Sequence, residues 1–206
     1  MHAGIPCFST GLSVALRDTT RKLEISDLGL ERVKGTLLAA ALDLLLEAGF
    51  GAAVLTDKKD LSLLRRGRRF FEENFEIIDA AAEGGKRYYQ GRFLLRTDRA
   101  DDDMNVYVEF CPDPSQLFFD VLGEKFPDPI QVVRATPLDE PEADRLEQDP
   151  SSVDLVIRFK DIQSILDLAA KPTADVVGLL LDNVVRLTGN LGHLFKLGAI
   201  AADLRR

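Results

Sequence analysis

The sequence has few of the residues on which active sites and structural metal sites are commonly built. It contains two cysteines, Cys7 and Cys111, two histidines, His2 and His193, and no tryptophan. Because the cysteines are far apart and lack CxxC spacing, the sequence predicts neither a disulfide framework nor a zinc site. Two free thiols are typical of a reducing compartment, and we therefore expect a cytoplasmic protein.

The chain also lacks an excess of positive charge and a long uninterrupted apolar run. Its 26 Lys and Arg residues stand against 34 Asp and Glu residues, giving a net charge of −8. This balance argues against nucleic-acid binding, which needs cations for phosphate contacts. The apolar stretch 36–50 is interrupted by Asp43, and residues 1–18 have no basic region followed by an apolar one. We expect no signal peptide and no stable membrane insertion.

Motifs for catalysis or phosphate binding are missing as well. There is no GxSxG motif, and we expect His193 to be an exposed histidine on a helix surface. The carboxylates of Asp101–Asp103 lie in a turn and lack EF-hand spacing, and Gly84-Gly85-Lys86 precedes a strand, as in a hairpin turn. We therefore expect no catalytic residue, metal or cofactor; an enzyme that uses His193 or Asp101–Asp103 is the alternative.

The N-terminal part shows two helical patterns. Over 28–48 the polar residues Arg32, Thr36, Asp43 and Glu47 form one narrow stripe, and the remainder is mostly apolar. This pattern predicts an extension, residues 1–55, made of a leader and a helix that must be covered on several sides.

The second pattern, over 59–74, contains the basic stretch RRGRR at 65–69. The i,i+4 pairs Arg68–Glu72 and Arg69–Glu73 neutralise much of its charge, which favours a solvated helix face over a phosphate site.

Strands then dominate the pattern, and two helices follow near the end. Alternating residues predict an antiparallel meander, and a Pro-rich acidic stretch predicts a surface connection. The predicted elements are strands at 75–79, 88–97, 105–110, 130–136, 153–159 and 184–188, a short helix at 116–122 capped by Ser115, helices within 160–170 and 174–183, a surface connection at 136–152, and a terminal helix from 191.

The last quarter of the chain has more apolar surface than one modest sheet requires. Between Val176 and Ile200 most residues are Val, Leu, Ile or Phe. They either form an ordinary core or line a tunnel for an acyl chain or an isoprenoid. Burial of ten methylenes contributes about 8 kcal/mol, which corresponds to roughly micromolar affinity before ordering costs. An apolar tunnel would therefore retain such a ligand without a polar anchor.

Residues 153–200 resemble the C-terminal half of the sterol carrier protein 2 (SCP2) family. The family pattern is a strand, two short helices, a strand ending in Gly-Asn and a final helix with a Lys-Leu pair. The matching residues are Asp154, Val156, Ile157, Phe159, Asp161, Ile165, Val185, Leu187, Gly189, Asn190, Leu191, Gly192, Lys196 and Leu197. Residues 1 to about 55 and the acidic insertion at 136–152 fall outside the resemblance.

The resemblance implies an α+β fold over 56–206, with a curved, mostly antiparallel five-stranded sheet covered by helices on one face. It also implies a tunnel that binds sterols, fatty acyl chains or isoprenoid lipids without catalysis, and in some relatives an accessory role in ubiquinone biosynthesis. Gly189 and Asn190 would shape the turn before the final helix. The residues expected to line the tunnel are Ile157, Phe159, Ile165, Leu180, Leu187, Leu191, Leu194, Phe195 and Leu197.

A second hypothesis is that the chain is a scaffold acting through protein contacts. The apolar surface of 28–48 would then form a homo-oligomer interface or contact a lipid-modifying enzyme.

Overall fold

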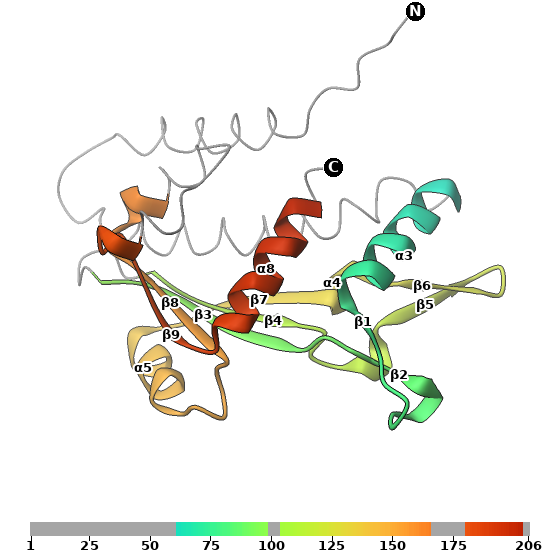
Figure 1. Cartoon of the computed structure of the whole chain (residues 1–206), viewed down its shortest axis with the longest axis horizontal. Coiled ribbons are helices and arrows are strands. Elements are labelled where there is room, and N and C mark those ends of the chain that lie inside the picture. The colour runs from blue at the N-terminus through green and yellow to red at the C-terminus, as the bar shows by residue number, and fades with distance from the viewer. Residues whose placement is uncertain (1–60, 99–103, 166–179, 204–206) are drawn as a thin grey trace, which may run out of the picture.

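The computed structural model describes residues 61–98, 104–165 and 180–203 (Figure 1). The predicted N-terminal extension, residues 1–55, and the predicted turn residues Asp101–Asp103 lie outside this part. The helices are α3 (Leu61–Phe75), α4 (Pro129–Val132), α5 (Glu140–Gln148) and α8 (Leu191–Asp203). The strands are β1 (Glu76–Ile78), β2 (Lys86–Tyr88), β3 (Gly91–Thr97), β4 (Asn105–Phe110), β5 (Phe118–Val121), β6 (Glu124–Pro127), β7 (Val133–Pro137), β8 (Leu155–Phe159) and β9 (Val185–Gly189).

The centre of the fold is a five-stranded sheet with the order β7-β4-β3-β8-β9. Its neighbours are antiparallel except β3 and β8, which pair in parallel with Phe93 opposite Leu155. The predicted α+β class with a mostly antiparallel five-stranded sheet is confirmed. Two small hairpins, β1-β2 and β5-β6, lie outside this sheet.

Alternation of side chains gives the sheet two different faces. In β8, Leu155, Ile157 and Phe159 join the main apolar core, whereas Val156 joins a smaller cluster on the other face. Arg158 also points to that second face, where it contacts α5. The period of two residues in a strand produces this separation directly from the sequence LVIRF.

Helices cover both faces of the sheet. In Figure 1, α3 and α8 lie on one side of the sheet and α5 lies on the other. The two helices on the first side are linked at their ends, where the Asn74 amide donates to the Asp203 carboxylate at 3.1 Å. The prediction that helices cover one face only is therefore wrong, because α5 occupies the opposite face.

Helix α5 lies within the acidic stretch that was expected to be a surface connection. Asp139 caps its first turn by accepting a hydrogen bond from the backbone N–H of Glu142 at 2.9 Å. Ala143 is buried beside Leu94 and Val156 of the sheet. The acidic and Pro-rich composition concealed a helix because the side chains that anchor it are few.

The predicted helix at 116–122 is wrong, because Gln116 ends a short 3-10 helix (Pro114–Gln116) and Phe118–Val121 form strand β5 of a hairpin. Strands β5 and β6 pair across a two-residue turn in which Leu122 and Gly123 both have positive φ. The Asp120 carboxylate accepts a hydrogen bond from the Gly123 N–H at 2.9 Å and closes this turn. The preceding cap is Asp113, which binds the backbone N–H of Ser115, so Ser115 does not act as a cap.

Two other predicted strands have different limits. The predicted strand 88–97 is interrupted after Tyr88, and β1 with β2 forms a separate hairpin, so the expected three-stranded meander is wrong. The predicted strand 130–136 begins as α4 and becomes extended only from Val133. Helix α3 and strands β4, β8 and β9 lie close to their predicted positions.

Candidate functional site

The residues predicted to line a tunnel fall into three groups by burial. Ile157, Phe159 and Ile165 are buried in the main core. The partly buried ones, which pack against this core, are Leu180, Leu187, Leu194 and Leu197. Leu191 and Phe195 are 51% and 76% exposed. The structure therefore brings the first two groups together and leaves Leu191 and Phe195 at the surface.

The partly buried group forms an apolar rim between β9 and α8, which we define as Leu180, Leu187, Leu194 and Leu197. Leu187 is on the apolar face of β9, the last strand of the sheet, and Leu194 and Leu197 extend from α8. The core thus reaches solvent at this edge through apolar side chains.

Helix α8 is apolar on its outer side as well. Leu191, Phe195, Gly198 and Ala199 are all exposed. At 100° per residue they lie on one face of the helix, and none of them is polar or charged. An exposed helix face normally presents polar residues to water, so the composition of this face points to a hydrophobic contact.

The Gly-Asn turn joins β9 to α8 under close contact with β8. Gly189 has φ +119, and a Cβ atom at this position would lie 2.4 Å from the carbonyl oxygen of Asp154. Only glycine fits this conformation and this space. Asn190 donates its backbone N–H to the same oxygen at 2.9 Å, and its side-chain oxygen accepts from the Gly192 N–H at 2.9 Å, capping α8.

His193 is half-buried, so the expectation of an exposed histidine is wrong. Its Nδ1 atom lies 2.7 Å from the hydroxyl oxygen of Tyr89, and its ring packs edge-on against Phe93. Burial, with a smaller contribution from the Asp154 carboxylate, raises the pKa of Tyr89 well above its usual value. The phenol of Tyr89 therefore keeps its proton, and its hydroxyl lies within hydrogen-bond distance of the His193 ring.

Lys196 is on the same side of α8 as His193. Its ammonium nitrogen lies 5.7 Å from the centre of the Tyr89 ring, in cation–π contact. Burial lowers the pKa of Lys196, and the negative charge of Asp203 partly counteracts this change. Sequence patterns could not reveal this group, because Tyr89 and His193 are separated by 104 residues.

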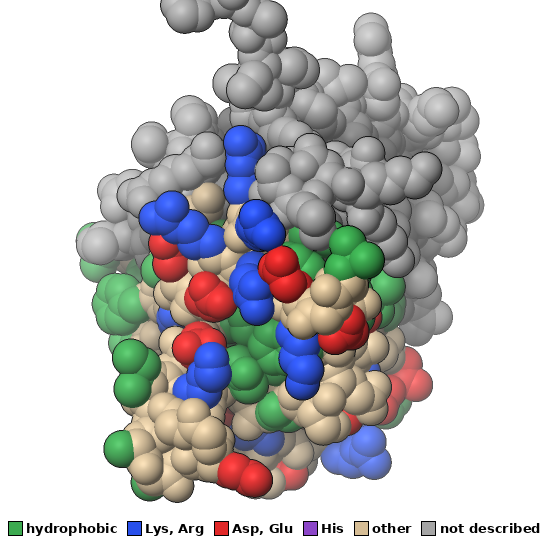
Figure 2. Space-filling view, turned by 90° about the vertical axis from the view of Figure 1, so that its right-hand side faces the viewer, with side chains coloured by type: hydrophobic (Ala, Val, Ile, Leu, Met, Phe, Trp, Pro, Cys, Tyr) green, Lys and Arg blue, Asp and Glu red, His purple; other side chains and the backbone are tan. Residues whose placement is uncertain are grey.

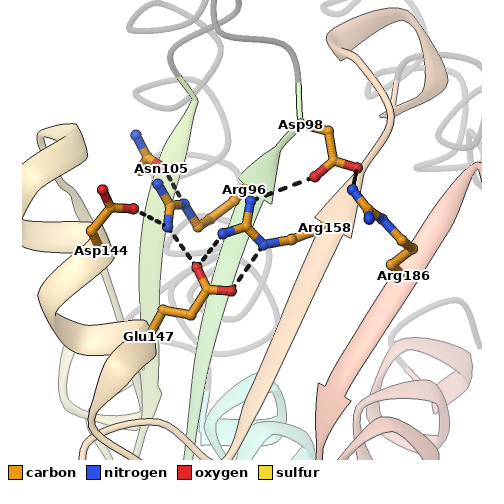
Figure 3. Close-up of polar contacts among 7 residues, drawn as sticks. All are labelled: Arg96, Asp98, Asn105, Asp144, Glu147, Arg158 and Arg186. Carbon is orange, nitrogen blue, oxygen red and sulfur yellow. Dashed lines mark hydrogen bonds and ion pairs between the residues drawn. The ribbon is translucent and has the colours of Figure 1, made fainter.

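The opposite face of the sheet carries a row of three arginines, one each from β3, β8 and β9 (Figure 3). Carboxylates of α5 and of the end of β3 lie between them. The pairs are Arg96 with Asp144, Glu147 and the Asn105 amide oxygen, Arg158 with Glu147 and Asp98, and Arg186 with Asp98. Arg96 and Arg158 therefore fasten α5 to the sheet. Three positive charges are paired with three negative ones, which leaves no net charge for a ligand.

The basic stretch of α3 is likewise paired with carboxylates. Arg69 lies 2.8 Å from Glu73, and Arg68 lies 3.4 Å from Glu72, as predicted. Arg65 and Arg68 also contact Glu124 of β6. Figure 2 shows positive and negative side chains interspersed with hydrophobic ones on this side of the molecule. The interpretation as a solvated face agrees with these contacts.

The Gly84-Gly85-Lys86 segment and Cys111, the remaining candidates for a binding or reactive site, both have contacts that account for them structurally. Gly84 and Gly85 have positive φ in the β1-β2 turn, and the Lys86 ammonium lies 2.9 Å from Glu76. Cys111 is fully buried, and burial raises the pKa of its thiol to about 12, which suppresses the reactive thiolate.

Within the described ranges, no cluster of three or more His, Cys, Asp or Glu residues is arranged to hold a metal ion. None of the helices described there is both long enough and apolar enough to cross a membrane.

Comparisons with known proteins found no matching family model, no similar curated protein and no similar solved structure.

Proposed function

We propose that this chain is a non-enzymatic binding module for a hydrophobic ligand, related to the SCP2 family, and that it works in the cytoplasm. The observation that carries the proposal is the apolar rim: the partly buried Leu187, Leu194 and Leu197 pack against the core between β9 and α8. A sterol, fatty acyl or isoprenoid chain would enter here and contact Ile157 and Phe159 beneath. The favourable free energy would come from burial of its methylenes.

The Gly-Asn turn supports the proposal by fixing the position of α8 over the sheet. Because the Asp154 carbonyl accepts the Asn190 N–H, the first turn of α8 is anchored to β8. The N-terminal half of α8, which includes Leu194, then has a defined distance from Ile157. Ligand entry would require movement of side chains in the rim and no displacement of the helix start.

Ligand binding is tested first on the purified full-length chain. Native mass spectrometry is expected to show co-purified lipid, and a fluorescent fatty acid is expected to bind in a saturable way. Absence of both signals would remove the proposal.

The location of the ligand is tested by filling the rim. Leu194→Trp places a larger side chain between α8 and the core, and we expect at least a tenfold weaker affinity for the fluorescent fatty acid. Leu122→Trp is the matched control, because Leu122 is 88% exposed at the tip of the β5-β6 hairpin. Equal affinities of the two variants would show that the ligand binds elsewhere.

A second candidate is an accessory scaffold for lipid-modifying enzymes, such as those of ubiquinone biosynthesis. The exposed Leu191 and Phe195 favour it, because they offer an enzyme an apolar contact surface. Phe195→Asp would then abolish binding of the enzyme and leave the affinity for the fluorescent fatty acid unchanged. Unchanged binding of the enzyme by Phe195→Asp would contradict the scaffold role of this surface.

A further inference from the structure

Among the described residues, strand β9 is an edge strand of the central sheet. In the part of the chain that the structure describes, β9 pairs with β8 alone and ends the strand order. Its sequence, VRLTG, contains no proline, and its one charged residue, Arg186, is paired with Asp98. The opposite edge strand, β7, ends in Pro137. Natural proteins block edge strands with proline or unpaired charge, and β9 has neither.

Exposed apolar side chains lie at both ends of β9. Leu181, which precedes the strand, is 76% exposed, and Leu191 and Phe195, which follow it, are 51% and 76% exposed. Leu180 and α8 both pack against the core on the same face of the sheet. The two exposed groups are therefore on one side of the sheet and are separated by the length of the strand.

We propose that β9 pairs with β9 of a second copy of this chain, in antiparallel orientation about Leu187. The twofold axis is perpendicular to the sheet, so both α8 helices lie on the same face of a continuous ten-stranded sheet. Leu187 is then opposite Leu187 of the second copy, and Arg186 is opposite Thr188. This register places no like charges opposite one another.

The two exposed groups explain why a second copy fits better than another occupant. In an antiparallel pair, the end of one strand is beside the beginning of the other. Leu191 and Phe195 of one copy therefore meet Leu181 of the second copy, and symmetry repeats the contact. An extended peptide would satisfy the backbone edge but would leave at least one of the two groups uncovered. The inference does not depend on the proposed ligand.

Sedimentation equilibrium of the full-length chain tests the association. The wild-type mass is expected to rise with concentration from 22.8 kDa toward twice that value. Leu181→Asp and Phe195→Asp are each expected to raise the dissociation constant at least tenfold, with unchanged circular dichroism. Ile78→Asp, at a residue that is 90% exposed on β1, is the control and should change nothing. A monomer at every concentration, or equal weakening by Ile78→Asp, would overturn the proposal.

Cross-linking tests the register. In a Cys7→Ser background, Leu187→Cys places two thiols opposite each other across the axis, at a Cβ separation of about 4.5–5.5 Å. Thr188→Cys, one residue away, faces Arg186 of the second copy instead. Oxidation is expected to give a covalent dimer only with Leu187→Cys. A cross-link only with Thr188→Cys, or with neither variant, would overturn the pairing about Leu187.

Discussion

On one face of the five-stranded sheet, Phe93 and Ile157 lie in an apolar core beneath α3 and α8, whereas on the other face Arg96 and Arg158 contact carboxylates of α5. The same strands supply both sets of side chains. The first face is therefore stabilised mainly by removal of apolar area from water, and the second mainly by charged hydrogen bonds with a smaller apolar cluster. We therefore expect the attachment of α8 to be sensitive to loss of apolar side chains, and the attachment of α5 to be sensitive to loss of charge.

The largest effect is expected in the apolar core. Phe93 is 1% exposed and packs edge-on against Phe110 at a ring distance of 5.4 Å. Phe93→Ala should lower the free energy of unfolding by about 3–5 kcal/mol, because it removes buried area and leaves a cavity. Phe195→Ala, at an exposed phenylalanine, should change it by less than about 0.5 kcal/mol. Urea unfolding at low protein concentration measures both, and similar values would refute the assignment of the core face.

The charged face is tested by Glu147→Gln. Glu147 binds both Arg96 and Arg158, and the Arg96 side chain is only 4% exposed. Loss of these charged hydrogen bonds should lower the free energy of unfolding by about 1.5–3 kcal/mol. Glu142→Gln in the same helix is the control, since its exposed pair with Arg145 should contribute less than about 1 kcal/mol. If Glu147→Gln lowered the free energy of unfolding no more than Glu142→Gln, the arginine row would not hold α5 on the sheet.

The same residue predicts sensitivity of this face to acid. Burial alone would raise the pKa of Glu147, but hydrogen bonds from Arg158 and Arg96 outweigh it and lower the pKa. The stability that ionised Glu147 contributes is therefore complete above its unfolded-state pKa of about 4.3. This stability is lost as the pH falls through the lower pKa of the folded state. Urea unfolding between pH 7 and pH 3 should show a shallower acid dependence for Glu147→Gln than for wild type. Parallel curves would contradict the depressed pKa.

The turn at the end of β9 gives a third comparison, between two glycines. Gly189→Ala should lower the free energy of unfolding by about 1–3 kcal/mol, because it forces positive φ on alanine beside the Asp154 carbonyl. A Cβ at Gly198 meets no atom within 4 Å, and this glycine lies inside α8. Gly198→Ala should therefore stabilise by about 0.5–1 kcal/mol. Thermal unfolding distinguishes the two signs, and a stable Gly189→Ala variant would exclude the strained turn.

The smallest effect concerns the polar contact beneath α8. Tyr89→Phe removes the hydroxyl bound to His193 and keeps the tilted contact of the two rings, so the free energy of unfolding should fall by about 0.5–1.5 kcal/mol. His193→Phe alone and the double variant complete a double-mutant cycle. Additive losses would show that the two side chains do not interact.

Local sequence patterns predicted the central strands because each satisfies its own alternation. In NVYVEF and LVIRF every second residue is apolar, and these segments became β4 and β8. The segment FFDV has no alternation, so its apolar run was interpreted as helical, although Leu122-Gly123 formed a hairpin turn. In α5, the capping residue Asp139 and the spacing of Ala143 from Leu146 were the signals that the acidic composition obscured.

The candidate site was less predictable because its contacts join distant segments. The apolar character of residues 180–197 was evident, but their division into buried, partly buried and exposed groups depends on the position of α8. Tyr89 joins His193 only after the sheet has formed. The arginine row follows from alternation in β3, β8 and β9, yet its partners in α5 required the helix that the sequence interpretation missed.

The parallel pairing of β3 with β8 has a consequence for biosynthesis. These two central strands are joined by contacts such as that between Arg92 and Asp154, which are 62 residues apart. During translation, β3, β4 and β7 emerge first and can pair as an antiparallel unit, while the flank of β3 that receives β8 remains uncovered. Because non-local contacts form slowly, the nascent chain exposes that flank until its last quarter has left the ribosome. The central seam of the sheet, between β3 and β8, is therefore completed only late in synthesis.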